Sequence, residues 1–271
     1  MRGSRSQSAR GSHGQLRAGV LGRSAGGASH GQSARAAGTL ACVASGVALH
    51  LRSAVALLGS FPALAGADLD VATGEVVLVR GANGAGKTTL LRVCAGLLGV
   101  VSGEVEVLGH DLTVDRRAVR RLVGLQGQTG GLYDDLTVRE NVRFAVRAAG
   151  ADAAGVPAAM ERCGLTGRLA GTPVARLSTG QRRRTSLAIM VARRPALWLL
   201  DEPHAGLDAD GRDLLDELIR DAAAGGATVV LASHELERAT ALASRSVTVA
   251  GGVVRPTSEL STTEREPAHV A

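Results

Sequence analysis

The sequence has few aromatic residues, almost no lysine and, in its first quarter, no acidic residue. Phenylalanine, tyrosine and tryptophan supply four of the 271 residues, and Lys87 is the one lysine among 31 basic side chains. Seven arginines and no acidic residue precede Asp68, so the remaining chain has 24 basic and 25 acidic side chains. The charge behind the sequence pI of about 10.4 therefore lies in a Gly/Ser/Arg-rich leading segment. This distribution argues against a basic domain that binds nucleic acid.

Cysteines and long apolar runs are also scarce. Cys42, Cys94 and Cys163 are odd in number and far apart, which excludes a disulfide framework or metal-ligand spacing and fits a reducing compartment. The longest mildly apolar stretch, residues 36–51, is interrupted by Gly, Ser and His. It is also shorter than the roughly 20 residues that a spanning helix needs. We therefore expect a chain that does not itself cross a membrane.

The composition changes at about residue 48, where short apolar runs punctuated by glycine and aspartate begin. We expect residues 1–46 to be a disordered tail or the product of a misassigned start; a secretory signal or an organellar transit peptide is the alternative. Residues 47–256 are expected to form one folded domain, followed by a flexible tail at 257–271. No internal repeat of about 20–50 residues is visible.

Apolar patterning predicts strands and helices that alternate along the folded part. The predicted strands, including a C-terminal hairpin, are residues 69–71, 76–80, 105–108, 122–125, 196–200, 228–232 and 246–254. The predicted helices are residues 86–98, 137–149, 156–163, 186–192 and 210–224. This order indicates an α/β fold with a parallel sheet that is covered on both faces.

A glycine-rich segment joins the strand predicted at 76–80 to the next helix. It fits the pattern G-x-x-x-x-G-K-[ST] and consists of Gly81, Ala82, Asn83, Gly84, Ala85, Gly86, Lys87, Thr88 and Thr89. Its backbone N–H groups and the helix N-terminus would surround a phosphate, Lys87 would reach the β- and γ-phosphates, and Thr88 would hold Mg²⁺. A chance glycine turn is the alternative. A required ammonium explains the one lysine among many arginines, since the two groups are not interchangeable.

Two carboxylates follow the apolar strand predicted at 196–200. Asp201 and Glu202 lie at what would be the C-terminal end of a buried parallel strand, where such folds bind ligands, and Pro203 stops the strand. In a P-loop ATPase, Asp201 would bind Mg²⁺ through water and Glu202 would polarise the water that attacks the γ-phosphate. Alone, Asp-Glu-Pro would be read as a charged turn. The phosphate loop in the same chain favours the catalytic interpretation.

A second anion site is predicted before the helix at 186–192. The segment Ser178, Thr179, Gly180 and Gln181 offers a hydroxyl and free N–H groups at a helix N-terminus. Taken alone, it would be an ordinary helix cap. With the preceding leucine it resembles the signature motif Leu-Ser-Gly-Gly-Gln of ATP-binding cassette (ABC) proteins, with Thr179 in place of the first glycine.

Further segments resemble ABC motifs in the order of that family. Gln128, followed by the segment 132–137, resembles the Q-loop; Asp208 in Gly-Leu-Asp resembles the D-loop; and His234 in Ala-Ser-His-Glu resembles the switch histidine. The resemblance covers roughly residues 48–255. It implies a P-loop NTPase with a mixed β-sheet core flanked by helices, and a helical subdomain inserted at about residues 129–177.

The resemblance also implies roles for these residues. Two domains would pair head to tail, so that the signature residues Ser178, Thr179, Gly180 and Gln181 act on the partner's ATP and Asp208 contacts the partner. His234 would contact the γ-phosphate and position the water with Glu202. Gln128 would bind Mg²⁺ and couple hydrolysis to the movement of a partner.

Two positions depart from the family pattern. The family stacks adenine on an aromatic residue, but alignment places Leu58 there, with Phe61 close by; Phe61 would substitute, or adenine would pack on aliphatic surface. Thr179 keeps its N–H but adds bulk where the partner's phosphate approaches. Neither change removes a catalytic group.

The leading functional interpretation is the ATPase subunit of a membrane transporter. Such a subunit would use ATP and Mg²⁺, pair with a multi-spanning permease and a second nucleotide-binding domain, and lie in the cytoplasm at the inner face of the cell membrane. The compact length and the Gly-Leu-Tyr-Asp-Asp-Leu-Thr segment resemble small exporter-type subunits, including haem exporter ATPases. A regulator without a membrane partner is the alternative. The single cassette and the absence of a heptad run in the sequence argue against tandem-cassette translation factors and coiled-coil repair ATPases. P-loop kinases and GTPases would lack the signature and the switch histidine.

Overall fold

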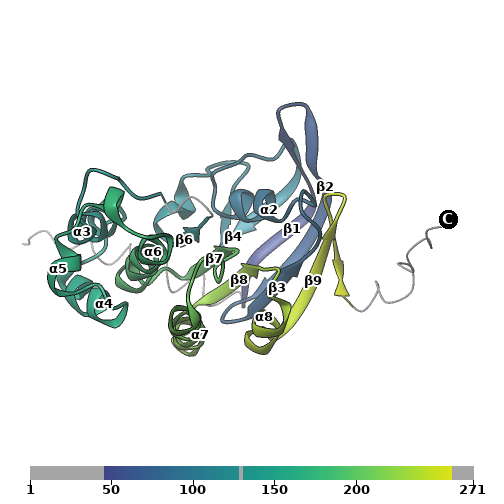
Figure 1. Ribbon diagram of the computed structural model, residues 1–271. Helices are drawn as coiled ribbons and strands as arrows, with labels where there is room; N and C mark the ends of the chain where they lie inside the picture. The colour runs from purple at the N-terminus through teal and green to yellow at the C-terminus, as the bar shows by residue number, and fades with distance from the viewer. Residues whose placement is uncertain (1–45, 128–130, 258–271) are drawn as a thin grey trace, which may run out of the picture.

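The computed structural model describes residues 46–127 and 131–257, which form two β-sheets and the helices around them (Figure 1). The larger sheet has the order β10-β9-β3-β8-β7-β6. Its strands are β10 (Val253–Pro256), β9 (Arg245–Ala250), β3 (Val76–Arg80), β8 (Thr228–Ala232), β7 (Leu197–Asp201) and β6 (Val123–Gln126). All neighbouring pairs are parallel except β10 with β9. The expected parallel sheet and C-terminal hairpin are therefore confirmed.

The smaller sheet is antiparallel, with the order β2-β1-β4-β5. Its strands are β1 (Val47–Leu58), β2 (Phe61–Ala72), β4 (Ser102–Val107) and β5 (His110–Asp111). The β1–β2 hairpin contains two long strands, whereas the sequence predicted one short strand at 69–71 in this region. The sequence pattern missed it because register shifts interrupt its pairing and break the strict alternation of apolar and polar residues.

The helices lie on both sides of the larger sheet and at one end of the molecule (Figure 1). They are α2 (Lys87–Cys94), α3 (Val138–Ala148), α4 (Val156–Arg162), α5 (Gly167–Ala170), α6 (Thr179–Arg193), α7 (Ala209–Ala224) and α8 (Leu236–Leu242). The short 3₁₀ turns are η1 (Ala118–Arg121), η2 (Ala153–Gly155) and η3 (Val174–Arg176). Helices α3, α4 and α5 follow β6 and lie on the side away from the smaller sheet. Within the described ranges, no helix combines the length and apolar character needed to cross a bilayer.

The hydrophobic core is divided by the larger sheet. Strands β7 and β8 are buried along their whole length, and successive residues face opposite sides. Leu199 packs with α2 and the smaller sheet, whereas Leu200 packs with the helices α6 and α7. Burial on both faces explains why these strands read as continuous apolar runs in the sequence.

Two helices differ in length from their predictions. Helix α2 ends at Cys94 instead of residue 98, because Gly96 has φ +67° and a Cβ there would lie 2.1 Å from the carbonyl oxygen of Arg116. Helix α6 begins at Thr179, well before the predicted residue 186, because Ser178 and Gln181 form a capping box that starts it. The predicted domain limits at 47 and 256 stay a prediction, and both predicted tails lie almost entirely outside the described residues.

Asn141 on α3 holds the segment that leads from the larger sheet to the helices α3–α5. Its side chain is 2% exposed. Its Oδ1 accepts a hydrogen bond from the N–H of Tyr133 at 2.8 Å, and its Nδ2 donates to the carbonyl oxygens of Tyr133, Leu136 and Thr137. The three carbonyl oxygens also accept backbone hydrogen bonds, from the N–H groups of Leu136, Val174 and Asn141, so the buried amide adds a second bond to each and supplies a partner for the Tyr133 N–H.

We predict that Asn141→Ala lowers the free energy of unfolding by roughly 2 kcal/mol, because it removes the hydrogen bonds of a buried amide and leaves the N–H of Tyr133 without its side-chain partner. Urea unfolding measures the change. The control is Arg143→Ala, an exposed position on the same helix, which should shift the midpoint little. Equal midpoints for the Asn141 variant and the wild type would contradict the prediction.

Candidate nucleotide site

The glycine-rich loop connects β3 to α2 at the C-terminal edge of the larger sheet. Gly81 and Gly86 have φ values of +145° and +112°. A Cβ at Gly81 would lie 2.3 Å from the carbonyl oxygen of Val249, and one at Gly86 would lie 2.5 Å from that of Ala63. The loop is therefore held between β9 and β2 so closely that only glycine fits at these two positions.

Lys87 opens α2 and folds back over the loop. It is 7% exposed, and its Nζ donates hydrogen bonds to the carbonyl oxygens of Gly81 at 2.7 Å and Ala82 at 3.0 Å. Neither partner is charged. The ammonium thus lies at the centre of the concave loop, where an anion bound by the N–H groups would meet it.

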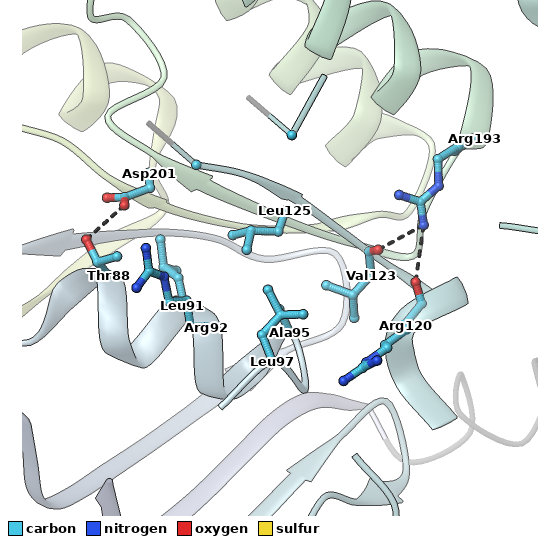
Figure 2. Close-up of a pocket in the computed structure, with 12 residues that line it drawn as sticks. Thr88, Leu91, Arg92, Ala95, Leu97, Arg120, Val123, Leu125, Arg193 and Asp201 are labelled. Carbon is cyan, nitrogen blue, oxygen red and sulfur yellow. Dashed lines mark hydrogen bonds between the residues drawn. The ribbon is translucent and has the colours of Figure 1, made fainter. Parts of the chain in front are cut away.

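Asp201 ends β7 and points toward the first turn of α2 (Figure 2). It is 3% exposed, and its Oδ2 accepts a hydrogen bond from Thr88 Oγ1 at 2.8 Å. The sequence predicted that these two residues share one site, and the structure brings them together. A carboxylate and a hydroxyl of this kind are hard oxygen donors.

Glu202 follows Asp201 and has an unusual backbone conformation. Its φ is +50°, which costs roughly 1–3 kcal/mol in a residue other than glycine and persists only when the surroundings impose it. Its N–H donates to the carbonyl oxygen of Ala232 at 2.8 Å. This turn directs the side chain toward the segment that follows β8.

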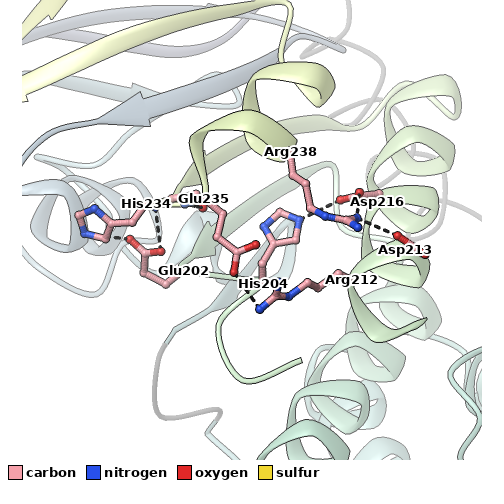
Figure 3. Close-up of polar contacts among 9 residues, drawn as sticks. Glu202, His204, Arg212, Asp213, Asp216, His234, Glu235 and Arg238 are labelled. Atoms are coloured by element: carbon pink, nitrogen blue, oxygen red, sulfur yellow. Dashed lines mark hydrogen bonds and ion pairs between the residues drawn. The ribbon is translucent and has the colours of Figure 1, made fainter. Parts of the chain in front are cut away.

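The carboxylate of Glu202 meets His234 (Figure 3). Its Oε2 accepts a hydrogen bond from the N–H of His234 at 3.1 Å. Its Oε1 lies 3.3 Å from His234 Nε2 but is buried and has no hydrogen-bond partner among the described residues. His234 Nε2 itself lies 2.7 Å from Oδ1 of Asn83 in the glycine-rich loop. Three predicted site segments therefore meet at this point.

These groups surround a cavity of about 410 Å³. Its lining residues are Leu58, Phe61, Ala63, Asn83, Gly84, Gly86, Lys87, Thr88, Thr89, Arg92, Asp201, Glu202 and His234. Phe61 is 66% exposed and Leu58 is 47% exposed, and both flank the turn between β1 and β2. A second cavity, of about 530 Å³, adjoins it and shares Thr88, Arg92 and Asp201 (Figure 2).

Arg92 is a lining residue that the sequence reasoning missed. It lies one helical turn after Thr88 on α2, and residues at this spacing face the same side of a helix. The four-residue spacing from Thr88 could therefore have placed Arg92 at the site from the sequence.

The signature residues lie elsewhere on the chain. Ser178 Oγ accepts a hydrogen bond from the N–H of Gln181 at 3.2 Å, and Gln181 Oε1 accepts one from the N–H of Ser178 at 3.0 Å. The ordinary capping interpretation thus holds for the chain by itself. Thr179 approaches the D-loop, since a Cβ on Gly206 would lie 3.0 Å from Thr179 Cγ2. None of Ser178, Thr179, Gly180 and Gln181 lines either described cavity.

Asp208 is engaged within its own chain. Its Oδ1 accepts hydrogen bonds from Arg184 Nη2 at 2.8 Å and from the N–H of Gly211 at 2.9 Å, which caps α7. The Arg184 guanidinium and this N–H hold the pKa of Asp208 below its usual range. Arg184 belongs to the helix that begins at the signature segment, so this ion pair joins the signature helix to the D-loop.

The predicted Q-loop residue Gln128 lies outside the described residues. Gln126, at the end of β6, is buried, and both amide atoms lack a hydrogen-bond partner within the described ranges. Arg183 lies nearby, and its Nη1 donates to the carbonyl oxygen of Gly127 at 3.3 Å. Burial lowers the pKa of Arg183, although Asp201 and Glu202 oppose this effect.

The chain is similar to ATP-binding proteins that are named for export and for drug resistance. It is 46% identical over 169 residues to the cytochrome c biogenesis ATP-binding export protein CcmA of Bordetella bronchiseptica, covering 62% of this chain and 75% of that protein. It is 43% identical over 203 residues to the daunorubicin resistance ATP-binding protein DrrA3 of Streptomyces coeruleorubidus, covering 72% of this chain and 63% of that protein.

Solved structures and a family model agree with this similarity. The dimeric post-hydrolysis state of the ATP-binding cassette MJ0796 bound to ADP and Pi has a TM-score of 0.70 and 25% identity, over 76% of this chain and 96% of that chain. The family model described as ABC transporter matches residues 64–205. With its phosphate loop, acidic strand end and signature segment on this fold, the chain belongs to the ABC transporter family, as an ATP-binding and ATP-hydrolysing subunit.

Proposed function

We propose that this ABC ATPase powers a membrane exporter and that Glu202 polarises the water that attacks the γ-phosphate. The observation that supports this role is the buried Oε1 of Glu202. This oxygen has no hydrogen-bond partner among the described residues and lies beside a cavity that the phosphate loop also lines. A carboxylate oxygen in such a position is suited to accept a proton from water.

The phosphates of ATP would occupy the concave side of the loop. Lys87 Nζ would exchange its two carbonyl partners for phosphate oxygens, and the N–H groups of the loop and of α2 would supply the remaining hydrogen bonds. His234 Nε2 would then exchange Asn83 for the γ-phosphate. Its backbone N–H would keep Glu202 in place throughout.

The residues present fit a magnesium ion. Thr88 Oγ1 and Asp201 Oδ2 lie 2.8 Å apart at the buried end of the cavity, and Mg²⁺ prefers such oxygen donors while keeping several waters. Thr88 would hold the ion directly and Asp201 through water, with Gln128 as the third proposed ligand. When bound, the ion neutralises charge that develops on the phosphates.

The signature segment would act on a second copy. Ser178 lies at the start of the 15-residue helix α6, and none of the signature residues lines the cavity of its own chain. A helix N-terminus favours an anion. We therefore propose a head-to-tail dimer in which Ser178, Thr179, Gly180 and Gln181 meet the partner's γ-phosphate and Asp208 lies at the dimer interface.

Export is proposed from the named relatives. One is a cytochrome c biogenesis export protein and another a daunorubicin resistance protein, so the transported compound is proposed to be of the haem or drug type. The chain would lie at the inner face of the cell membrane, bound to a multi-spanning permease. A regulator without a membrane partner does not explain this similarity.

Tagged in its own host, the chain should co-purify with a multi-spanning membrane protein from detergent-solubilised membranes. Recovery from the cytosolic fraction alone, with full ATPase activity and no membrane partner, would contradict the exporter proposal.

We predict that Glu202→Gln binds ATP but hydrolyses it at least about 100-fold more slowly, because the amide cannot accept the proton. ATP should also hold this variant as a dimer. Single-turnover hydrolysis and light scattering measure the two effects.

The control is Glu237→Gln, which makes the same chemical change at an exposed position of α8. It should hydrolyse ATP at the wild-type rate. Near-wild-type hydrolysis by Glu202→Gln would refute the assignment of the base.

We predict that Phe61→Ala raises KM for ATP by about 2- to 10-fold at an unchanged kcat, because a lost aromatic stack weakens binding by about 0.5–1.5 kcal/mol. Steady-state kinetics measure it. The control is Phe144→Ala, which removes the other phenylalanine of the chain, on α3, and should leave KM unchanged. An unchanged KM for the Phe61 variant would indicate that adenine packs elsewhere.

A further inference from the structure

A buried histidine lies beside the candidate catalytic carboxylate, and the functional site does not use it. His204 follows Glu202 by two residues and is 1% exposed. Its Nε2 lies 2.8 Å from Oδ1 of Asp216 on α7. Because a carboxylate only accepts, His204 Nε2 carries the proton of this hydrogen bond. Its Nδ1 is buried and has no hydrogen-bond partner in the described parts of the chain.

Asp216 receives a second donor from a different element. It is 6% exposed, and its Oδ2 accepts a hydrogen bond from Arg238 Nη1 at 2.8 Å. Arg238 also donates to Asp213 Oδ1 at 2.8 Å. One buried carboxylate on α7 therefore joins the turn after β7 to helix α8 (Figure 3).

The two joined segments are those that carry Glu202 and His234. Strands β7 and β8 end at Asp201 and Ala232, and the last backbone contact between them is from the N–H of Glu202 to the carbonyl oxygen of Ala232. Beyond this point, no strand pairing holds either segment. His204 lies two residues after Glu202, and Arg238 lies four residues after His234, in the first turn of α8.

A second contact joins the same elements. Arg212 Nη2 on α7 lies 3.3 Å from Oε1 of Glu235, the residue after His234. Helix α7 thus contacts the segment after β8 at two points and the segment after β7 at one buried point. His204 and Arg238 thus both bind Asp216, and they lie two residues after Glu202 and four residues after His234 along the chain. The N–H of His234 in turn donates to Glu202, so contacts and short chain segments connect the two reactive residues on both sides.

The chemistry of the His204–Asp216–Arg238 network favours a positioning role. Replacing a buried ion pair by well-packed apolar side chains of similar volume is often neutral for stability, so stability alone does not account for this network. Glu202 has a positive φ that its surroundings must impose, and a displacement of about 1 Å at a reacting group lowers rates by about 100-fold.

We propose that His204 is a positioning residue for ATP hydrolysis: through Asp216 and Arg238, it holds the Glu202 turn in register with His234. This inference rests on the proposed roles of Glu202 and His234. Neither His204 nor Asp216 lines the cavity that would hold ATP, so the network is expected to act on turnover and to leave nucleotide affinity unchanged.

The test compares two substitutions at His204. His204→Leu fills a similar volume without a donor, whereas His204→Gln places an amide N–H near the position of Nε2. The leucine variant should lower kcat by about 10- to 100-fold with KM for ATP unchanged. The glutamine variant should recover kcat to within about threefold of the wild type. A leucine variant with wild-type kcat, or a glutamine variant as slow as the leucine variant, would overturn the inference.

Ile219→Val is the control that distinguishes a less stable protein from a displaced Glu202 turn. This substitution removes a buried methylene from α7 without touching Asp216, and the kinetics are measured well below both melting temperatures. It should keep the wild-type kcat. A fall in kcat equal to that of the leucine variant would show that any loosening of α7 has this effect, and would overturn the inference.

Arg238→Leu removes the other donor to Asp216, and because the Arg238 side chain is 37% exposed, this variant tests the network even if the His204→Leu variant does not fold. Its kcat should fall by about 3- to 10-fold at an unchanged KM, and the double variant should be less impaired than the product of the single effects. An unchanged kcat would overturn the inference.

Glu202→Gln, measured in the same assay, distinguishes the two proposals. If it abolishes turnover while His204→Leu does not lower it, the inference fails and the proposed function stands. If Glu202→Gln hydrolyses ATP normally, the base assignment fails and the positioning inference fails with it.

Discussion

The parallel pairing of β3, β8 and β7 is the constraint on which the site depends. Because these neighbouring strands run in one direction, the phosphate loop, the acidic strand end and the segment with His234 all begin at the same edge of the sheet. The ladder runs as far as Asp201 opposite Ala232, and one further hydrogen bond sets the turn at Glu202. Glu202 and His234, which are proposed to act at the γ-phosphate, then lie one and two residues beyond a strand end, at the carboxyl edge of the sheet where such folds bind ligands.

Much of this arrangement could be predicted from the sequence, because its signals are local. The glycine-rich loop and the carboxylates have fixed spacings, and strands buried on both faces read as apolar runs, so β8 was predicted at its observed bounds. The ends of α2 and α6 could not be predicted in the same way. They depend on a close contact between Gly96 and a distant carbonyl, and on a capping box that the sequence also allowed as a phosphate site.

The parts of the site that were missed are set by tertiary contacts. Nothing in the spacing of His204, Asp216 and Arg238 indicates that they meet, because they belong to a turn and two helices that are brought together only by packing. The same holds for Thr179 and Gly206, whose contact connects the signature segment with the D-loop. Sequence motifs identify the groups that would touch ATP, whereas the contacts between motifs require the fold.

The folded-back lysine explains why one ammonium is retained in a chain otherwise rich in arginine. Lys87 Nζ already donates hydrogen bonds to two carbonyl oxygens of its own loop. When a phosphate binds, the ammonium can exchange these carbonyl oxygens for phosphate oxygens, and the positive charge is already in place. The loop keeps its concave shape because its own cation occupies the centre. The flexible lysine side chain and its compact ammonium can move from a carbonyl oxygen to a phosphate oxygen within this space. The larger, planar guanidinium of arginine would require the loop backbone to rearrange. The ammonium of Lys87 therefore preorganises the phosphate loop before any phosphate is bound.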